Sequence, residues 1–281
     1  MRSLGSTGSV SNLLIVAKAG GRILESGMPP QVAEDICEVV KSNSFVFVHG
    51  GGIEVTELAE KLGKEQRFII SPEGFRSRYT DRETMDIFTM VMAGKLNKQI
   101  VMMLESKGVN TIGLSGLDGC LIKAERKKRL VVINEKGRKQ VIDGGYTGSI
   151  NAVNAKLLNL LLDSGYVPVI SPIAMSEEFE PLNVDGDRVA AKTAVALKAD
   201  ILVLLTDVEG VALEGKILPR LGLNETKEIL PKIGPGMITK LQAATEALEN
   251  GVKEVVIASG QRQKPISSAI NHQVGTVISN G

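Results

Sequence analysis

Apolar, strand-like segments alternate with amphipathic helical segments along almost the whole chain, and this pattern restricts the possible folds more than any other feature. The clearest apolar segments are residues 13–17, 45–48, 166–173, 201–206 and 254–258. Their alternation with helical patterns predicts an α/β fold with a mostly parallel, doubly wound sheet and helices on both faces. Ligands of such sheets bind beyond the carboxyl ends of the strands, so we expect a site there.

Glycine-rich and charged clusters follow three of these segments. Lys18 precedes Gly20 and Gly21 after the first segment, HGGG occupies residues 49–52 after the second, and TDVEG occupies residues 206–210. Glycine lets backbone N–H groups approach an anion closely, and the N-terminus of a following helix adds a favourable dipole. The clusters therefore predict a site for the phosphates of a nucleotide.

Three common interpretations of such clusters do not fit. HGGG can form the oxyanion hole of a lipase, but that reaction needs a GxSxG motif, and GLSGL at residues 113–117 ends in leucine. Neither a GxxxxGK[ST] P-loop nor a GxGxxG motif followed by a helix is present. A phosphate site in this chain must therefore be built differently.

Two lysines are candidates for phosphoryl transfer, a reaction that needs positive charge and hydrogen-bond donors around the transferred group. Lys18 comes from the first half of the chain, and Lys240 lies in GPGMITK, where glycines precede a helix. Asp187, in the run NVDGD, is a candidate to orient both amines. A lysine taken alone is more often a solvated surface residue. The repeated position at strand ends favours the functional interpretation.

Composition argues against a nucleic-acid partner. The chain of 281 residues has 33 Lys and Arg against 32 Asp and Glu, a formal net charge of +1, so there is no overall basic field. Aromatic residues make up 3% and Trp is absent, which is poor material for stacking bases.

The ends, the cysteines and the hydropathy give weaker constraints. No apolar run approaches the length needed to span a bilayer, so no membrane contact is expected. Residues 1–12 are rich in Gly and Ser and are interpreted as a flexible leader. Cys37 and Cys120 form no metal-type cluster and suit a reducing, cytoplasmic location.

The middle of the chain departs from the alternation. Thr80 and Glu83 have the spacing of a capping box for a helix through residue 104. Residues 111–150 then read as short strands and β-hairpins. Residues 123–129 hold five basic residues and one acidic residue. This run is either a steering patch for an acidic partner or a charged hairpin that prevents edge-to-edge pairing.

Seven motifs, in fixed order from residue 13 onward, resemble those of the amino acid kinase family. They are KAGGR, HGGG, SRYTDRET, GLSGLDG, NVDGDRVAA, LTDVEGV and GMITK. The resemblance is greatest to the acetylglutamate kinase branch. Within it, SRYTD and DGGYTG resemble the lysine-pathway subgroup, whose substrate is carried by a small acidic protein of the LysW type. The family resemblance implies a three-layer α/β/α sandwich like that of carbamate kinase, with an acyl-substrate lobe at residues 13–172 and an ATP lobe at residues 173–281.

The resemblance also implies roles for individual residues. The catalytic set consists of two lysines that stabilise the transition state and the aspartate that organises them: Lys18, Lys240 and Asp187. Substrate would be bound by Gly51, Gly52, Arg78 and Asn183. ATP would be bound by Gly20, Gly21, Thr206, Asp207, Gly210, Gly236 and Met237. The carrier protein would contact the basic run through Lys123, Arg126, Lys127, Lys128 and Arg129.

The implied reaction transfers the γ-phosphoryl group of ATP, accompanied by Mg²⁺, to the side-chain carboxylate of carrier-linked 2-aminoadipate or glutamate. A carboxylate is already ionised at neutral pH, so no catalytic base is needed and no protein metal site is expected. The alternatives are an acetylglutamate kinase acting on the free amino acid derivative and a non-catalytic amino-acid-binding module. Asp185 stands where free acetylglutamate kinases usually have Asn, which favours the carrier-linked substrate. A homodimer is the expected assembly.

Overall fold

The computed structural model describes residues 12–25 and 27–280. Of the leader interpreted at residues 1–12, only Asn12 belongs to the described residues, so that interpretation lies outside them. Within the described part of the chain, no helix is both long enough and apolar enough to cross a membrane.

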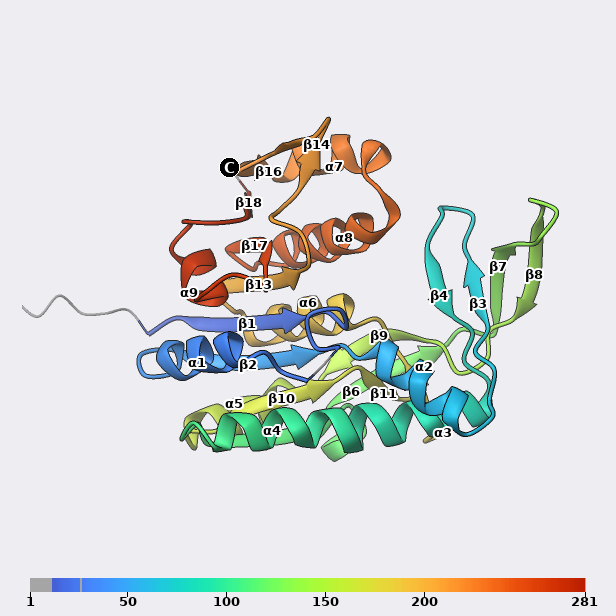
Figure 1. Ribbon diagram of the computed structural model, residues 1–281, viewed down its shortest axis with the longest axis horizontal. Coiled ribbons are helices and arrows are strands. Elements are labelled where there is room, and N and C mark those ends of the chain that lie inside the picture. The colour runs from blue at the N-terminus through green and yellow to red at the C-terminus, as the bar shows by residue number, and fades with distance from the viewer. Residues whose placement is uncertain (1–11, 26, 281) are drawn as a thin grey trace, which may run out of the picture.

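One eight-stranded sheet forms the centre of the molecule, in the order β16-β18-β17-β13-β1-β2-β10-β5 (Figure 1). Neighbouring strands are parallel, except that β17 and β18 are antiparallel. The strands are β1 (Leu14–Ala19), β2 (Ser44–His49), β5 (Thr111–Ser115), β10 (Val167–Ser171), β13 (Ile201–Thr206), β16 (Arg220–Gly222), β17 (Glu254–Ser259) and β18 (Thr276–Ser279). Because β1 pairs with β2 on one side and β13 on the other, both halves of the chain share this sheet.

Helices cover both faces of the sheet, because its strands are apolar on both sides. Along β1, Ile15 and Ala17 face one core cluster and Val16 faces the other, as the period of two requires. α1 (Pro30–Val39), α4 (Asn97–Glu105) and α9 (Pro265–Ile270) pack on the first face. α5 (Ala155–Asp163), α6 (Gly186–Leu197), α7 (Leu223–Ile229) and α8 (Pro235–Glu249) pack on the second. The predicted three-layer α/β/α fold is confirmed.

The helix predicted through residue 104 is present, but it contains a π-helical segment, and its predicted cap is wrong. α3 (Arg82–Thr89) passes into a π-helical segment, η1 (Met90–Leu96), before α4 begins. The cap is Asp81, whose Oδ1 accepts from the Thr84 N–H at 2.8 Å. Thr80 is buried instead, and its hydroxyl accepts from Asn183 Nδ2 at 2.9 Å. A long-range hydrogen bond therefore takes the hydroxyl that the local pattern assigned to capping.

Of the range 111–150 predicted to form hairpins, residues 111–115 instead form β5 of the central sheet, and the hairpins occupy residues 122–153 in two ladders. β6 (Ile122–Arg126) pairs with β9 (Gly148–Val153), and β7 (Arg129–Ile133) pairs with β8 (Lys139–Asp143). The first ladder belongs to a four-stranded sheet with β11 (Ile173–Met175) and β12 (Pro181–Asn183). The second ladder projects from the body beside the hairpin of β3 (Phe68–Ile70) and β4 (Arg76–Arg78) (Figure 1).

The remaining elements are short or cover the edges. α2 (Gly52–Lys61) follows the HGGG loop directly. β14 (Ala212–Leu213) and β15 (Lys216–Ile217) form a small antiparallel hairpin. Two short 3₁₀ turns, η2 (Asp118–Cys120) and η3 (Leu230–Lys232), complete the described elements.

Candidate active site

Two lysines from different halves of the chain meet at one buried aspartate. Lys18 lies inside β1, one residue before its end, and its Nζ is 2.7 Å from Asp187 Oδ1. Lys240, in the second turn of α8, places its Nζ 3.0 Å from Asp187 Oδ2. The three side chains are 8%, 12% and 5% exposed for Lys18, Lys240 and Asp187. Each carboxylate oxygen therefore holds one ammonium group, away from most solvent.

Asp187 reaches this position because α6 starts one residue earlier, at Gly186. Asp185 caps the helix by accepting from the Arg188 N–H at 2.9 Å, and Asp187 follows in the first turn. A carboxylate in the first turn is stabilised by the helix dipole. Gly186 leaves the space in between, because a methyl group there would stand 3.3 Å from Lys18 Cε.

The protonation of the three groups is coupled. Burial alone would raise the pKa of Asp187, but the charges of Lys18 and Lys240 outweigh it, so the pKa is lowered. Burial alone would lower the pKa of Lys18, but the charge of Asp187, its hydrogen bond and the charge of Asp185 together outweigh burial, so the pKa is raised. Burial and the charge of Lys18 lower the pKa of Lys240. Asp187 is therefore held in its ionised form between the two lysines.

The two glycine loops lie against each other next to Lys18. A methyl group on Gly21 would stand 3.3 Å from the Gly52 nitrogen, and one on Gly50 would stand 3.0 Å from the Gly21 nitrogen. A methyl group on Gly20 would stand 3.7 Å from Lys18 Nζ. Backbone nitrogens from both loops, the N-terminus of α2 and an ammonium group thus converge. This arrangement suits an anion with several oxygens.

Arg78 and Asn183 extend the site away from the sheet. Arg78 donates to Gly52 O at 2.6 Å and Thr56 Oγ1 at 2.8 Å, and also to Gln66 Oε1. All three acceptors are uncharged. Burial, together with the charge of nearby Arg76, lowers the pKa of Arg78 to about 10. Asn183, at the end of β12, is tied to Thr80 through its amide nitrogen.

The residues predicted to bind ATP lie in three places: the loop after β1, the end of β13 with the loop that follows it, and the start of α8. Thr206 ends β13 beside β1, and its hydroxyl donates to Asp207 Oδ1 at 3.1 Å. Gly210 lies against Thr276, because a methyl group on it would stand 2.8 Å from Thr276 Oγ1. Gly236 and Met237 occupy the first turn of α8, the helix that carries Lys240.

Sequence reasoning did not assign Arg22, the last residue of the KAGGR motif. Its guanidinium pairs with Asp207 at 2.6 Å, which joins the loop after β1 to the loop after β13. Within residues 12–25 and 27–280, no group of three or more His, Cys, Asp and Glu side chains is close enough to hold a metal ion.

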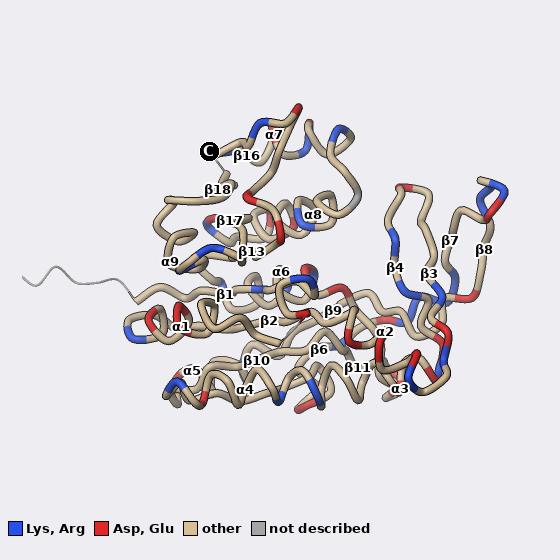
Figure 2. The backbone as a smooth tube through the Cα atoms, in the orientation of Figure 1, with Lys and Arg blue, Asp and Glu red and all other residues tan. Residues whose placement is uncertain are grey.

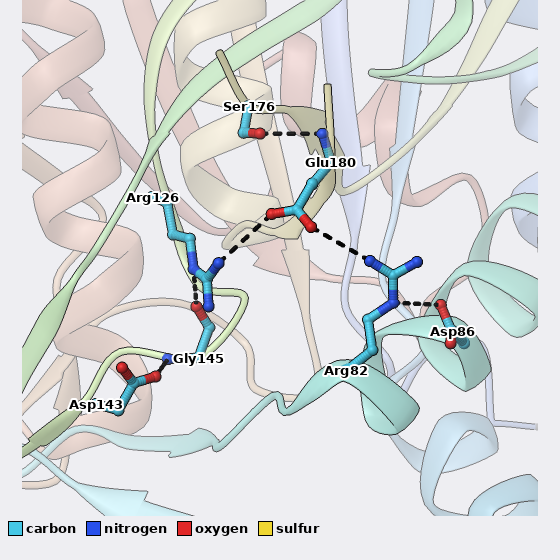
Figure 3. A network of polar contacts seen from close by, with 7 residues as sticks. All are labelled: Arg82, Asp86, Arg126, Asp143, Gly145, Ser176 and Glu180. Atoms are coloured by element: carbon cyan, nitrogen blue, oxygen red, sulfur yellow. Dashed lines mark hydrogen bonds and ion pairs between the residues drawn. The ribbon is translucent and has the colours of Figure 1, made fainter. Parts of the chain in front are cut away.

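The basic run divides into outward and inward residues. Lys123, Lys127, Lys128 and Arg129 are exposed. Arg126 turns inward, where its Nε donates to Gly145 O at 2.6 Å and its NH1 is 3.4 Å from Glu180 Oε2 (Figure 3). Figure 2 shows further Lys and Arg residues along both projecting hairpins.

Glu180 is a second residue that the sequence did not reveal. Its other oxygen, Oε1, is 3.4 Å from Arg82 NH1, so one carboxylate joins α3 to the β6–β9 ladder (Figure 3). The guanidinium groups of both arginines lie over the ring of Tyr146, at 5.5 Å for Arg82 and 4.4 Å for Arg126. Backbone hydrogen bonds join Tyr146 to Thr80 and to Asn183, and Asn183 is one of the residues predicted to bind substrate.

Comparison with known proteins places these observations in a family context. Residues 14–259 match the family described as Amino acid kinase family. A protein from Saccharolobus solfataricus named [LysW]-aminoadipate/[LysW]-glutamate kinase is 46% identical over 269 residues, which cover 95% of this chain and 100% of that protein. A relative from Nitrosopumilus maritimus (strain SCM1), provisionally named for the same activity, is 54% identical over 265 residues, which cover 94% and 99%.

Solved structures share the fold at lower identity. N-acetylglutamate synthase from Neisseria gonorrhoeae, complexed with coenzyme A and N-acetyl-glutamate, aligns with a TM-score of 0.80 at 23% identity, covering 96% of this chain and 60% of that chain. Carbamate kinase from Giardia lamblia bound to AMP-PNP aligns with a TM-score of 0.68 at 14% identity, covering 96% and 99%.

Proposed function

Because the chain belongs to the amino acid kinase family, we propose that it transfers the γ-phosphoryl group of ATP to the side-chain carboxylate of 2-aminoadipate, or of glutamate, linked to a carrier protein. The product is an acyl phosphate. The observation that carries the proposal is the buried cluster of Lys18, Asp187 and Lys240 beside two glycine loops. The names of the relatives from Saccharolobus solfataricus and Nitrosopumilus maritimus support the carrier-linked substrate.

The cluster suits this reaction because the chemistry needs charge and no base. The attacking carboxylate is ionised at neutral pH, so the protein must bring two anions together and stabilise the charge on the transferred group. Lys18 and Lys240 approach from opposite halves of the chain, and Asp187 holds both ammonium groups in place. Fixed charges in a site with little water stabilise a transition state more than they would in solvent.

Gly51 and Gly52 are proposed to donate backbone N–H bonds to substrate and phosphoryl oxygens. Arg78 is proposed to bind the free carboxylate of the substrate residue, and its three neutral partners support this role. A carboxylate ligand would give it charge-assisted bonds that amide and hydroxyl oxygens do not. Asn183 is proposed to hold the amide that links the amino group of the substrate to the carrier.

The nucleotide is proposed to lie between β1 and the second half of the chain. Gly20, Gly21, Thr206, Asp207, Gly210, Gly236 and Met237 are the proposed contacts. The division into an acyl-substrate lobe at 13–172 and an ATP lobe at 173–281 is part of this proposal. Mg²⁺ is proposed to arrive with ATP, because Asp187 is engaged by two lysines and phosphate oxygens with water suit this ion. When bound, it neutralises phosphate charge.

The carrier is proposed to be a small acidic protein of the LysW type. The hairpin strands β6 and β7 and the turn between them carry four exposed basic residues that can steer such a partner: Lys123, Lys127, Lys128 and Arg129. Arg126 remains in the proposed contact surface. Since Arg126 also pairs with Glu180, its substitution alters the packing of the β6–β9 ladder as well as the proposed contact surface.

The proposed assembly is a homodimer. Met102 on α4 and Leu160 on α5 are each 62% exposed, and burial of such side chains favours association. Light scattering coupled to size-exclusion chromatography measures the mass directly.

The substrate proposal is tested by trapping the acyl phosphate with hydroxylamine. Equal concentrations of carrier-linked aminoadipate, carrier-linked glutamate and free N-acetylglutamate are compared with ATP and Mg²⁺. We expect hydroxamate only from the carrier-linked substrates. Efficient turnover of free N-acetylglutamate would identify an acetylglutamate kinase, and no ATP-dependent product from any of them would favour a non-catalytic binding module.

A further inference from the structure

His49, the first residue of the HGGG loop, is fully buried and contacts a buried amide. Its Nε2 lies 3.2 Å from Nδ2 of Asn97, the first residue of α4. Its other ring nitrogen, Nδ1, lies 3.1 Å from Gly50 O. Both His49 and Asn97 are 0% exposed. The imidazole therefore bridges the start of α4 and the backbone of the glycine loop.

The orientation of the Asn97 amide follows from its other partners. Nδ2 faces two backbone carbonyl groups, Val169 O at 2.9 Å and Leu114 O at 3.4 Å. Oδ1 faces the Lys98 ammonium group at 3.0 Å. Carbonyl oxygens only accept and ammonium groups only donate, so Nδ2 is the nitrogen. Of its two hydrogens, one goes to Val169 O, and the other goes to His49 Nε2 at 3.2 Å in preference to the longer contact with Leu114 O.

This donor fixes the form of the imidazole. Because Nε2 accepts, His49 is neutral and carries its proton on Nδ1, which then donates to Gly50 O. Burial lowers the pKa of His49 to about 4; the bond to Gly50 opposes this effect, and the charges of Lys98 and Lys18 add to it. A protonated ring would also place its Nε2–H against the N–H bonds of Asn97. The neutral form with the proton on Nδ1 is the one that all neighbours support.

The Gly50 carbonyl in turn sets the direction of the next N–H. In a planar trans peptide, the C=O of Gly50 and the N–H of Gly51 point in opposite directions. With the oxygen held by His49, the Gly51 N–H points away from the imidazole. The nitrogens of Gly51 and Gly52 are also the ones nearest to Gly21, at 3.5 Å and 3.3 Å from the position of a methyl group there.

We propose that Asn97 is a positioning residue for phosphoryl transfer: it holds His49 with the proton on Nδ1, and His49 holds the Gly50–Gly51 peptide so that the Gly51 N–H faces the space between the two glycine loops. The catalytic meaning of that N–H rests on the proposed function. The tautomer and the peptide orientation stand on the geometry alone.

The π-helical segment η1 explains how Asn97 and the loop are brought together. This segment ends directly before Asn97, and π turns inside helices are frequent at functional sites. Two of its residues, Met92 and Leu96, pack against Gly51. A methyl group on Gly51 would overlap Leu96 and stand 2.9 Å from Met92 Sδ. The same stretch thus supports the loop by packing at Gly51 and by a hydrogen bond at His49.

The first measurement is the tautomer of His49 by NMR of ¹⁵N-labelled imidazole. The chain has two histidines, and His272 lies at the surface, paired with Glu254. The variant His272→Gln therefore leaves a single histidine signal, which we expect to stay neutral with the proton on Nδ1 from pH 5.5 to 8. A proton on Nε2, or a charged ring in this range, would overturn the inference.

The second measurement changes Asn97 in the same background. Asn97→Asp replaces the donor by an acceptor, so we expect the proton of His49 to move to Nε2, or the ring to become charged. We expect kcat to fall at least ~10-fold, toward the 10²–10³-fold loss seen when a backbone-type donor to a transition state is removed, with KM values within about 3-fold. Asn97→Leu, which removes the donor at similar size, serves if the aspartate variant does not fold.

Gln99→Ala is the control on the same helix, because Gln99 is exposed and its removal leaves every hydrogen bond of Asn97 in place. It should keep the wild-type tautomer and a kcat within about 3-fold. An unchanged tautomer in both Asn97 variants, or a changed tautomer with unchanged kcat, would contradict the positioning role. If the wild-type chain turned over none of the substrates while His49 kept its proton on Nδ1, the proposed function would fail and the geometric part of the inference would stand.

Discussion

Asp187→Asn removes the ion-pair partner of two buried ammonium groups, and its effect on stability can be estimated from the structure. At an effective dielectric constant of about 20, unit charges at the observed 2.7 Å and 3.0 Å attract by about 6 and about 5.5 kcal/mol. Desolvation of the three ions offsets most of this gain. Removal of one partner from a buried ion pair costs about 3–5 kcal/mol, because the remaining charge stays buried. We expect a loss in that range, a large share of a typical total of about 5–15 kcal/mol.

The assay is thermal unfolding at pH 7, with Asp185→Asn as the matched control. At about 2–4 °C per kcal/mol for chains of this size, the Tm of Asp187→Asn should fall by roughly 6–20 °C. Asp185→Asn makes the same chemical change two residues away, on a residue exposed at the surface, and asparagine retains the capping oxygen. Desolvation by the surrounding protein and the charge of Asp187 raise the pKa of Asp185 in spite of the two lysines, so its charge adds little to stability. Its effect should stay within about 0.5 kcal/mol.

The pH dependence provides a second check on the same substitution. Because the pKa of Asp187 is lowered in the folded state, its contribution is complete above the ordinary pKa of an aspartate and is lost as the pH falls through the folded value. The difference between wild type and Asp187→Asn should therefore narrow in acid. A Tm for Asp187→Asn within 2 °C of the Asp185→Asn control at pH 7 would refute the reasoning.

Three further predictions concern charge. Lys127→Glu with Lys128→Glu should raise the KM for carrier-linked substrate at least ~10-fold at low salt and leave the KM for ATP unchanged; an unchanged KM for carrier substrate would count against the docking surface. Burial and the charge of Lys18 lower the pKa of Lys240, so kcat should decline at a pH below the ordinary lysine pKa. Lys240→Arg should move this decline to higher pH. Coincident profiles of kcat against pH for the wild type and Lys240→Arg would exclude Lys240 as the source of the decline. Glu54 is 4% exposed in the first turn of α2, and burial raises its pKa. Its ionised form therefore opposes folding as the pH rises, and Glu54→Gln should raise the Tm more at pH 8 than at pH 5. Equal gains in Tm at both pH values would show that ionisation is not the cause.

The central sheet was predictable because its signals are local. Apolar runs such as residues 201–206 must be buried, which is typical of strands in a parallel sheet covered on both faces. Glycines directly after such runs indicate strand ends at which a ligand binds. Lys18 was placed within one residue of its position for this reason. The needs of phosphoryl transfer suggested Lys18 and Lys240 with Asp187 between them, and the resemblance to known motifs then supported the same three residues, whose contacts span most of the chain.

The errors and omissions arose where distant partners decide the structure. Thr80 and Asp81 are both good capping residues, and the choice of Asp81 depends on a bond from Asn183 to the Thr80 hydroxyl. The interruption of the long helix by η1 has no signal in a sequence with regular apolar spacing. Glu180 lies in an ordinary turn, and only the fold brings it between Arg82 and Arg126.

The central claim is that a substrate carboxylate attacks the γ-phosphorus of ATP, and isotope transfer tests it most directly. Carrier-linked aminoadipate with both side-chain carboxylate oxygens labelled with ¹⁸O is incubated with the protein, ATP, Mg²⁺ and hydroxylamine. Hydroxylamine attacks the acyl carbon, the carbon–oxygen bond to the phosphoryl group breaks, and the bridging oxygen leaves with inorganic phosphate. We expect one ¹⁸O atom in each phosphate released. Phosphate formed from ATP without ¹⁸O, or no phosphate above the level without substrate, would contradict the account.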